Sequence, residues 1–201
     1  METIEASFSQ FDFAHGSASC TSASVLFARY ALEKVPTVAD LDKLLRAAAL
    51  LWKNWKDRCP SPYAFQTWKN VVDCFPGIFA NVDILHESNG FIGEEVTEEG
   101  RRDYLMASVG DCVGRMQESE SCAAVLTSSG SSYALVHRDG LFYFFDSHGS
   151  SRTGGRAYVL RIHSAEDLLT FVHSNFCPRE FSCLIIRKKQ SACTPDTPVS
   201  A

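Results

Sequence analysis

The stretch Leu-Phe-Tyr-Phe-Phe-Asp-Ser-His-Gly, residues 141–149, joins five apolar residues to a carboxylate and an imidazole. We interpret it as a strand, and side chains along a strand alternate between its two faces. Asp146 and His148 are therefore expected on the same side, roughly 6.5–7 Å apart at the backbone. That spacing suits a carboxylate that orients an imidazole. A polar turn that closes the strand is the alternative, because Asp-Ser-His-Gly is also favourable turn sequence.

Strands are predicted throughout the second half of the chain, where apolar and polar residues alternate. Besides residues 141–145, the predicted strands cover residues 122–127, 133–137, 157–162 and 181–187. Arg138-Asp139-Gly140 predicts a tight hairpin between two of them, because Asp-Gly favours the turn. A helix is predicted over residues 165–174, before the last strand.

The first half of the chain has the apolar periodicity of helices. The predicted helices run from a cap at Ser17 or Ser19 to about Glu33, from Pro36-Thr37 onward, from Ser61-Pro62 onward, and from about Glu98 to Met116. Thr37 and Asp40 have the spacing of a capping box. Residues 86–103 are expected to form an exposed loop that leads into the last of these helices.

Helices followed by a mostly antiparallel sheet indicate an α+β fold. A chain of 201 residues is long enough to bury a substantial core. We expect one domain over residues 1–190. The residues after Gln190 are rich in proline, serine and threonine, so a disordered tail is expected over residues 191–201.

Composition excludes several classes of protein. A net charge of −5 argues against a general nucleic-acid binder, and no segment approaches the ~20 apolar residues of a membrane span. The acidic start lacks a secretory signal, so we expect an intracellular, reducing compartment and a monomer. The eight cysteines are then expected as thiols. The spacing of Cys177 and Cys183 is poor for zinc, and neither a metal nor a cofactor is expected.

Cys20 is the candidate nucleophile, because it is the only cysteine at a predicted helix N-terminus. Free N–H groups and the helix dipole stabilise thiolate there. An acyl-transfer site also needs donors for an oxyanion. The N–H of Cys20 and the side chain of Gln10, on a loop that folds back beside the helix, could supply them. An inert buried thiol is the alternative for Cys20.

Other histidines compete for the role of base. His15 lies near Cys20 and Asp12 in the sequence, so these residues could form a local dyad. His137 is expected to be solvated in a turn. The remaining histidines are interpreted as structural or surface residues, and they are His86, His163 and His173.

The order of these motifs resembles the deubiquitinating cysteine protease domain at the start of the herpesvirus large tegument protein, and its tegument-like relatives in cellular organisms. The matching stretches are Gln10-Phe-Asp-Phe-Ala-His-Gly-Ser-Ala-Ser-Cys20 and Phe144-Phe-Asp-Ser-His-Gly149. The resemblance implies a papain-like fold with the cysteine on a helix that faces the sheet. By matching position, Cys20 would be the nucleophile, His148 the general base and Asp146 the group that orients it. Gln10 would complete the oxyanion hole.

The resemblance also implies an activity: a thiol isopeptidase that cleaves after the C-terminal glycine of ubiquitin, with ubiquitin or polyubiquitin as partner. A cysteine protease or transferase for another ubiquitin-like protein or peptide, and a non-catalytic ubiquitin-binding module, are the alternatives. The small residues Gly16, Ser17 and Ser19 are expected to line a narrow channel for a Gly-Gly tail. The acidic residues between Glu94 and Glu99 form either a solvated face or a contact surface for a basic partner.

Overall fold

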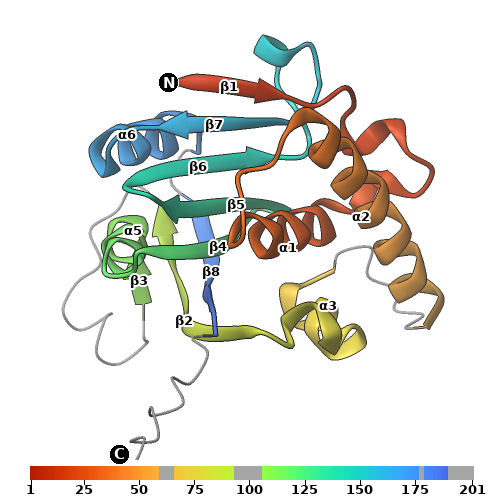
Figure 1. Cartoon of the computed structure of the whole chain (residues 1–201), viewed down its shortest axis with the longest axis horizontal. Helices are drawn as coiled ribbons and strands as arrows, with labels where there is room; N and C mark the ends of the chain where they lie inside the picture. The colour runs from red at the N-terminus through yellow and green to blue at the C-terminus, as the bar shows by residue number, and fades with distance from the viewer. Residues whose placement is uncertain (59–65, 93–105, 177–178, 190–201) are drawn as a thin grey trace, which may run out of the picture.

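The computed structural model describes residues 1–58, 66–92, 106–176 and 179–189. Within these ranges, eight strands form one sheet in the order β1-β7-β6-β5-β4-β8-β2-β3 (Figure 1). All neighbouring strands are antiparallel except β2 and β3. The strands are β1 (Glu2–Glu5), β2 (Val82–Ile92), β3 (Met106–Ser108), β4 (Ser121–Ser128), β5 (Ser131–Arg138), β6 (Leu141–Asp146), β7 (Tyr158–Ile162) and β8 (Arg179–Lys188).

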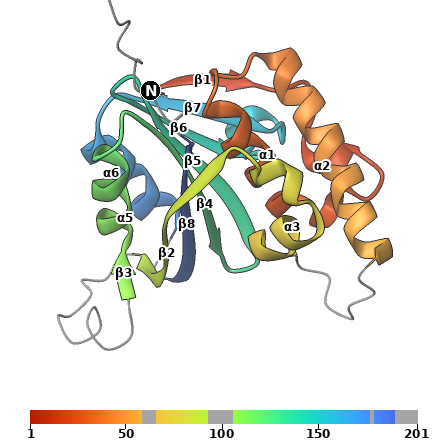
Figure 2. The same ribbon diagram turned by 60° about the horizontal axis from the view of Figure 1, so that its bottom comes forward.

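Helices cover both faces of this sheet, as Figure 2 shows. One face packs against α1 (Cys20–Ala31), α2 (Val38–Arg58) and α3 (Trp68–Cys74). The other face packs against α5 (Val109–Gln117) and α6 (Ala165–Asn175). None of the described helices has the length and apolar character needed to cross a membrane.

The two helical layers explain why β6 is apolar at five successive positions. Tyr143 and Phe145 belong to the core on the α1 side, whereas Phe142 and Phe144 belong to the core on the α5 and α6 side. A strand with one face in water would alternate apolar and polar residues, but a strand buried on both faces does not.

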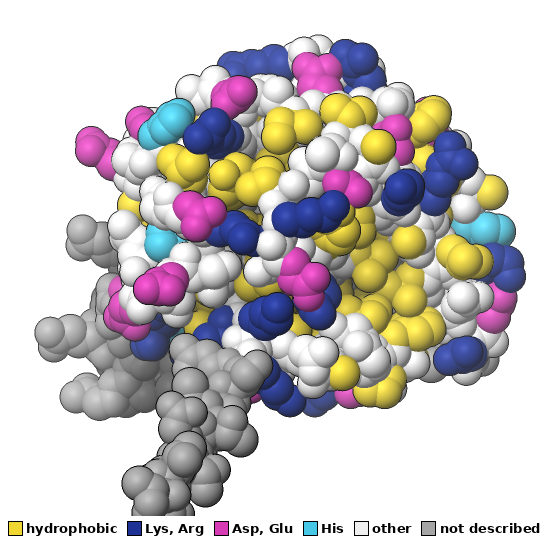
Figure 3. Space-filling view, in the orientation of Figure 1, with side chains coloured by type: hydrophobic (Ala, Val, Ile, Leu, Met, Phe, Trp, Pro, Cys, Tyr) yellow, Lys and Arg dark blue, Asp and Glu magenta, His cyan; other side chains and the backbone are white. Residues whose placement is uncertain are grey.

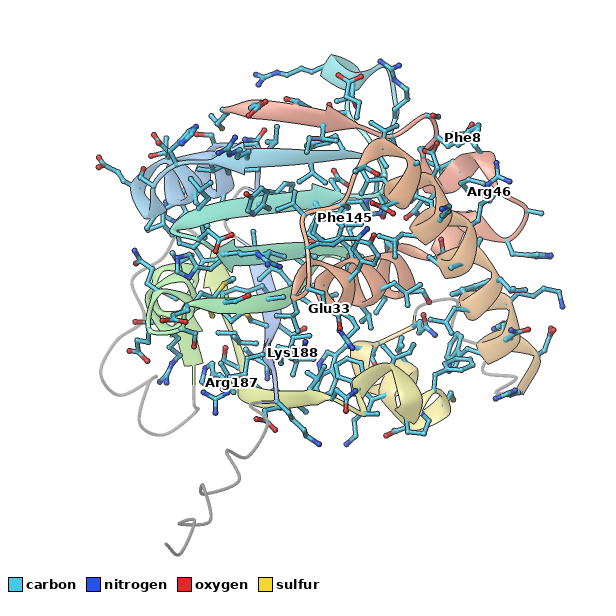
Figure 4. The ribbon with its side chains drawn as sticks, in the orientation of Figure 1. Phe8, Glu33, Arg46, Phe145, Arg187 and Lys188 are labelled. Carbon is cyan, nitrogen blue, oxygen red and sulfur yellow. The ribbon has the colours of Figure 1, made fainter. Side chains whose placement is uncertain are left out.

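Phe145 lies at the centre of the α1 side. Its side chain is fully buried, and its ring stacks on Phe27 of α1 with a centroid distance of 4.3 Å. Figure 4 shows the ring between the sheet and α1. This contact fixes α1 against β6, the strand that leads to Asp146.

Most of the predicted elements are confirmed. The five predicted strands correspond to β4, β5, β6, β7 and β8, and the helix predicted over residues 165–174 is α6. Asp139 and Gly140 both have positive φ angles, as a tight hairpin requires. Thr37 and Asp40 form the expected capping box at α2.

Three strands were not predicted: β1, β2 and β3. Residues 86–92 were expected in a loop, but they pair with β8 as part of β2. The sequence Glu87-Ser-Asn-Gly90 has weak strand propensity, so its pairing is decided by the neighbouring strand and not by its own residues.

One predicted helix needs correction. The helix predicted from about Glu98 to Met116 does not run unbroken, since residues 106–108 form β3 and α5 begins at Val109, where Ser108 and Asp111 form a capping box. Residues 93–105, which include the acidic segment Glu94–Glu99, lie outside the described residues. The same holds for Ser61-Pro62 and for the predicted tail. The described part of the third helix begins at Trp68, capped by Thr67.

Basic and acidic side chains are interspersed over the face of the molecule that carries α1 and α2 (Figure 3). Ion pairs on this surface include Arg29 with Glu33 and Lys53 with Asp57, each one helical turn apart. Such exposed pairs contribute little to the free energy of unfolding, so the fold depends mainly on the two apolar cores.

Replacing Phe145 by Ala should lower the free energy of unfolding by about 3–5 kcal/mol, because it removes a fully buried ring and leaves a cavity against Phe27. Urea denaturation followed by circular dichroism measures the change. Leu50→Ala is the control, since Leu50 on α2 is 59% exposed and should change stability by under about 0.5 kcal/mol. Equal losses in the two variants would contradict the central position of Phe145.

Candidate active site

Cys20 is the first residue of α1, as predicted, and its side chain lies against the hairpin that joins β4 and β5. Its Sγ is 4.0 Å from the carbonyl oxygen of Gly130, and the backbone N–H of Ser132 donates to it. Ser19 precedes the helix, but its hydroxyl donates to the carbonyl oxygen of Gly16 and caps no helical N–H group. The free N–H groups of the first turn therefore act on the thiol, where they stabilise a thiolate.

Asp146 and His148 are in contact, although not in the way that strand alternation predicts. Strand β6 ends at Asp146, and His148 lies in the bend that follows. The Oδ1 atom of Asp146 accepts from the backbone N–H of His148 at 2.8 Å and is also 2.8 Å from the ring Nδ1. The same carboxylate thus closes the turn and orients the imidazole. The polar turn and the carboxylate–imidazole pair, which were alternatives for this stretch of sequence, are therefore both present.

Tyr158 supports the carboxylate from the adjacent strand. Residue 158 of β7 is the register partner of Asp146 in β6, so the buried Tyr158 side chain lies beside the Asp146 carboxylate. Burial and the nearby carboxylate raise the pKa of Tyr158, so its hydroxyl stays protonated. Tyr158 was not among the residues predicted from the sequence, because its proximity to Asp146 follows from the pairing of β6 with β7.

The Cys20 thiol and the His148 imidazole interact electrostatically, and each shifts the pKa of the other. Because Nδ1 is engaged by Asp146, Nε2 is the ring nitrogen left to interact with the sulfur. Burial raises the pKa of Cys20, but the interactions led by that with His148 outweigh burial, and the pKa lies below its ordinary value. Burial lowers the pKa of His148, whereas its interactions with Asp146 and Cys20 raise that pKa, to about 9. Both shifts favour the form of the pair in which the thiol is deprotonated and the imidazole protonated.

Two aromatic rings flank the imidazole. The ring centroids of Tyr133 and Phe11 lie 5.8 and 5.9 Å from that of His148. Phe11 is 56% exposed and Tyr133 is partly buried, so one side of the imidazole borders the protein interior and the other borders solvent. The rings restrict the imidazole to the orientation that Asp146 sets.

Gln10 reaches the site because the N-terminal segment is part of the sheet. Strand β1 pairs with β7, and the chain continues alongside it: the Phe8 carbonyl oxygen accepts from Ala157 N–H, and Gln10 N–H donates to the Ser147 carbonyl oxygen at 2.9 Å. Arg46 of α2 lies over the rings of Phe8 and Phe13 and holds this segment from the other side (Figure 4). Gln10 is therefore firmly placed, as the first residue of a 3-10 helix in the segment that folds back beside the start of α1.

The side chain of Gln10 is buried between the segment that leads into α1 and the bend that carries His148. Its Oε1 accepts from the Ser147 hydroxyl at 2.7 Å, and its Nε2 donates to the Ser17 carbonyl oxygen at 3.5 Å. The structure thus brings together all four predicted site residues, which are Gln10, Cys20, Asp146 and His148.

The small residues before Cys20 serve a different purpose from the one expected. A Cβ atom at Gly16 would collide with the backbone carbonyl of Gln10, so glycine is needed for the close approach of these two segments. Ser19 is fully buried, and of Gly16, Ser17 and Ser19 only Ser17 is exposed. Gly16 and Ser19 therefore assemble the site and do not line a channel.

The alternative histidines are placed elsewhere. The Asp12 carboxylate accepts from the N–H and hydroxyl of Ser9, as the cap of a 3-10 helix over residues 10–12. His15 is exposed in a left-handed backbone conformation. The prediction that His137 is solvated is wrong: its ring is buried, with Nδ1 2.9 Å from the Ser119 carbonyl oxygen.

No group of three or more histidine, cysteine, aspartate and glutamate side chains among the described residues could hold a metal ion. The described cysteines are thiols not joined in disulfides with one another, and they are Cys20, Cys74, Cys112, Cys122 and Cys183. The groups present at the site are a thiol paired with an imidazole that can accept and donate a proton, and amide donors from Gln10 and the start of α1. This set of groups is suited to acyl transfer.

No protein-family model and no curated protein sequence matches the chain. Among solved structures, the chain is similar to the ubiquitin-specific protease encoded by tegument protein M48 of murine cytomegalovirus, in a crystal structure with a ubiquitin-based suicide substrate. The TM-score is 0.72, and the match covers 98% of this chain and 90% of that chain. The sequences are 14% identical, so the comparison establishes a shared fold of helices and a mainly antiparallel sheet.

The pKa shifts predict how the reactivity of Cys20 depends on pH. In the wild type, alkylation of Cys20 by iodoacetamide should persist below the ordinary thiol pKa. In His148→Ala the half-maximal pH should move upward, because the largest of the effects that oppose burial of the thiol is then lost. At pH 7 the rate should fall by about tenfold or more. Mass spectrometry of the peptide that contains Cys20 measures the rate.

His15→Ala is the control for this measurement, because His15 is exposed and should leave the pH profile unchanged. A shift in His15→Ala together with an unshifted profile in His148→Ala would contradict the pairing of Cys20 with His148. Such a result would instead support the local dyad of Cys20 and His15.

Proposed function

We propose that this protein is a deubiquitinating cysteine protease of papain-like fold, which cleaves the bond after the C-terminal glycine of ubiquitin. One observation carries the proposal. The Cys20 thiol, at a helix N-terminus, interacts with an imidazole that Asp146 orients, on a fold shared with a viral ubiquitin-specific protease. We place the activity in a single domain over residues 1–190.

In the proposed reaction the Cys20 thiolate attacks the carbonyl carbon of the terminal glycine. The developing oxyanion accepts hydrogen bonds from the Cys20 backbone N–H and the Gln10 side chain. His148 donates its proton to the departing lysine amine, and a thioester remains on Cys20. His148 then removes a proton from water, which attacks the thioester and releases the ubiquitin carboxylate and the thiolate.

Ubiquitin is the proposed partner because the similar viral protease was crystallised with a ubiquitin-based substrate. A module that only binds ubiquitin would have no need of a paired thiol and imidazole, an orienting carboxylate and an amide donor together. The chemistry also requires a reduced Cys20, so we place the protein in a reducing, intracellular compartment.

A ubiquitin probe with a thiol-reactive group at its C-terminus should label the wild type at Cys20. Cys20→Ala should not be labelled but should keep its fold and its affinity for ubiquitin, because only the sulfur is removed. His15→Ala is the matched control and should be labelled like the wild type. Mass spectrometry of the adduct identifies the residue.

Probes built on ubiquitin-like modifiers distinguish the alternatives. If one of these probes labelled the protein and the ubiquitin probe did not, the substrate would be that modifier and not ubiquitin. The proposed thiol chemistry would be unchanged. If no probe labelled the folded wild type, the protein would not be a thiol isopeptidase.

Replacing Asp146 by Asn should lower kcat for ubiquitin–fluorophore hydrolysis by about 10²-fold or more, because the amide no longer selects the imidazole tautomer that faces the thiol. The loss should be smaller than in Cys20→Ala, since a thiol needs less help from its base than a serine does. Asp83→Asn is the control, because this half-exposed carboxylate in β2 lies away from the site and pairs with Arg187. Near-normal kcat in Asp146→Asn would mean that another group orients His148.

A further inference from the structure

In the sequence, Ser147 stands between Asp146, which orients the imidazole, and His148, which carries it. The proposed reaction gives Ser147 no role. Its side chain is fully buried. Both of its polar groups meet the same residue: its carbonyl oxygen accepts from Gln10 N–H at 2.9 Å, and its hydroxyl donates to Gln10 Oε1 at 2.7 Å. Gln10 lies 137 positions away in the sequence, so this contact joins two distant segments at the site.

The contact matters because a glutamine amide has two unlike ends. The oxygen end only accepts hydrogen bonds and the nitrogen end only donates them, so a rotation by half a turn would exchange acceptor and donor. Only the nitrogen end can stabilise an oxyanion. The orientation of the Gln10 amide therefore decides whether it can act.

Two partners select the productive orientation. The Ser17 carbonyl oxygen can only accept, so it requires the nitrogen end of the amide, and Nε2 lies 3.5 Å from it. The Ser147 hydroxyl then satisfies the oxygen end. One N–H of Gln10 is used by Ser17, and in the proposed reaction the second donates to the developing oxyanion. A rotated amide would place oxygen against the Ser17 carbonyl oxygen, which is repulsive.

We propose that Ser147 is a positioning residue for the oxyanion hole: its hydroxyl holds the Gln10 amide with its donor end toward the thiol of Cys20. This inference rests on the proposed function for its catalytic consequence. It makes Asp146-Ser147-His148 a single unit in which the first residue orients the base, the second orients the oxyanion donor and the third transfers the proton.

The side chain and the backbone of Ser147 have separable effects. The backbone bond from Gln10 N–H to the Ser147 carbonyl oxygen joins the two segments, and it persists when the side chain is changed. Ser147→Ala removes only the hydroxyl. A variant of this kind tests the orientation of the amide without detaching the N-terminal segment.

The test is a double-mutant cycle on ubiquitin–fluorophore hydrolysis. Gln10→Ala should lower kcat by about 10²–10³-fold, the usual effect of losing one oxyanion donor. Ser147→Ala should lower kcat by about tenfold, the size expected for one lost hydrogen bond, with little change in KM. In the Gln10→Ala background, Ser147→Ala should cause no further loss, because the amide that it positions is gone.

Ser88→Ala is the matched control, since Ser88 is also a buried serine but lies in β2 and contacts Cys112, away from Gln10. It should leave kcat unchanged in both backgrounds. Thermal melts establish that each variant is folded. An equal loss from Ser147→Ala in both backgrounds would overturn the inference, because Ser147 would then act on the fold and not through Gln10. An unchanged kcat in the single variant would overturn it as well.

A second readout separates this inference from the proposed function. If the folded wild type did not hydrolyse the ubiquitin substrate, the proposed function would fail, and nuclear magnetic resonance of the Gln10 side-chain amide would decide the role of Ser147. The amide protons should exchange slowly with solvent in the wild type and at least about tenfold faster in Ser147→Ala. The Gln10→Ala variant assigns the signal. Equal exchange rates would show that Ser147 does not hold the amide.

Discussion

The burial of β6 on both faces is the constraint on which the rest of the structure depends. Phe145 stacks on Phe27 and fixes α1 on one side, while Phe142 and Phe144 pack toward α5 and α6 on the other. A strand held in this way cannot slip by one residue without exchanging its two faces. The position at which β6 ends is therefore fixed, and so are Asp146 and the bend that carries His148 to the N-terminus of α1.

Burial of the site has opposing consequences for its charges. Burial disfavours both the thiolate of Cys20 and the imidazolium of His148. His148 stabilises the thiolate, whereas Asp146 first and Cys20 second stabilise the imidazolium. Asp146 lies on the Nδ1 side of the imidazole, and Tyr158 of β7 lies beside its carboxylate. The reactive state of the thiol is thus a property of the whole arrangement and not of Cys20 alone.

The site is assembled from three segments that are far apart in the chain. The helix start supplies Cys20, the end of β6 supplies Asp146 and His148, and the segment after β1 supplies Gln10. The last of these depends on the pairing of β1 with β7 and on the close approach of Gly16 to the Gln10 carbonyl. Residues that touch no reacting atom therefore decide whether the donor and the nucleophile meet.

Short-range chemistry in the sequence was enough to predict the capping box at Thr37, the Asp139-Gly140 turn and the apolar run of β6. It also singled out Gln10, Cys20, Asp146 and His148 as candidate site residues. Which distant segments pair could not be predicted in this way, because it depends on the packing of the whole chain. The polar residues of β2 form a strand because β8 supplies their hydrogen bonds, and His148 meets Asp146 through a turn and not across a strand face. The contact of Ser147 with Gln10 likewise depends on the register of β1, β6 and β7. Local propensity is encoded by neighbouring residues, whereas register is set by burial and by pairing over the whole sheet.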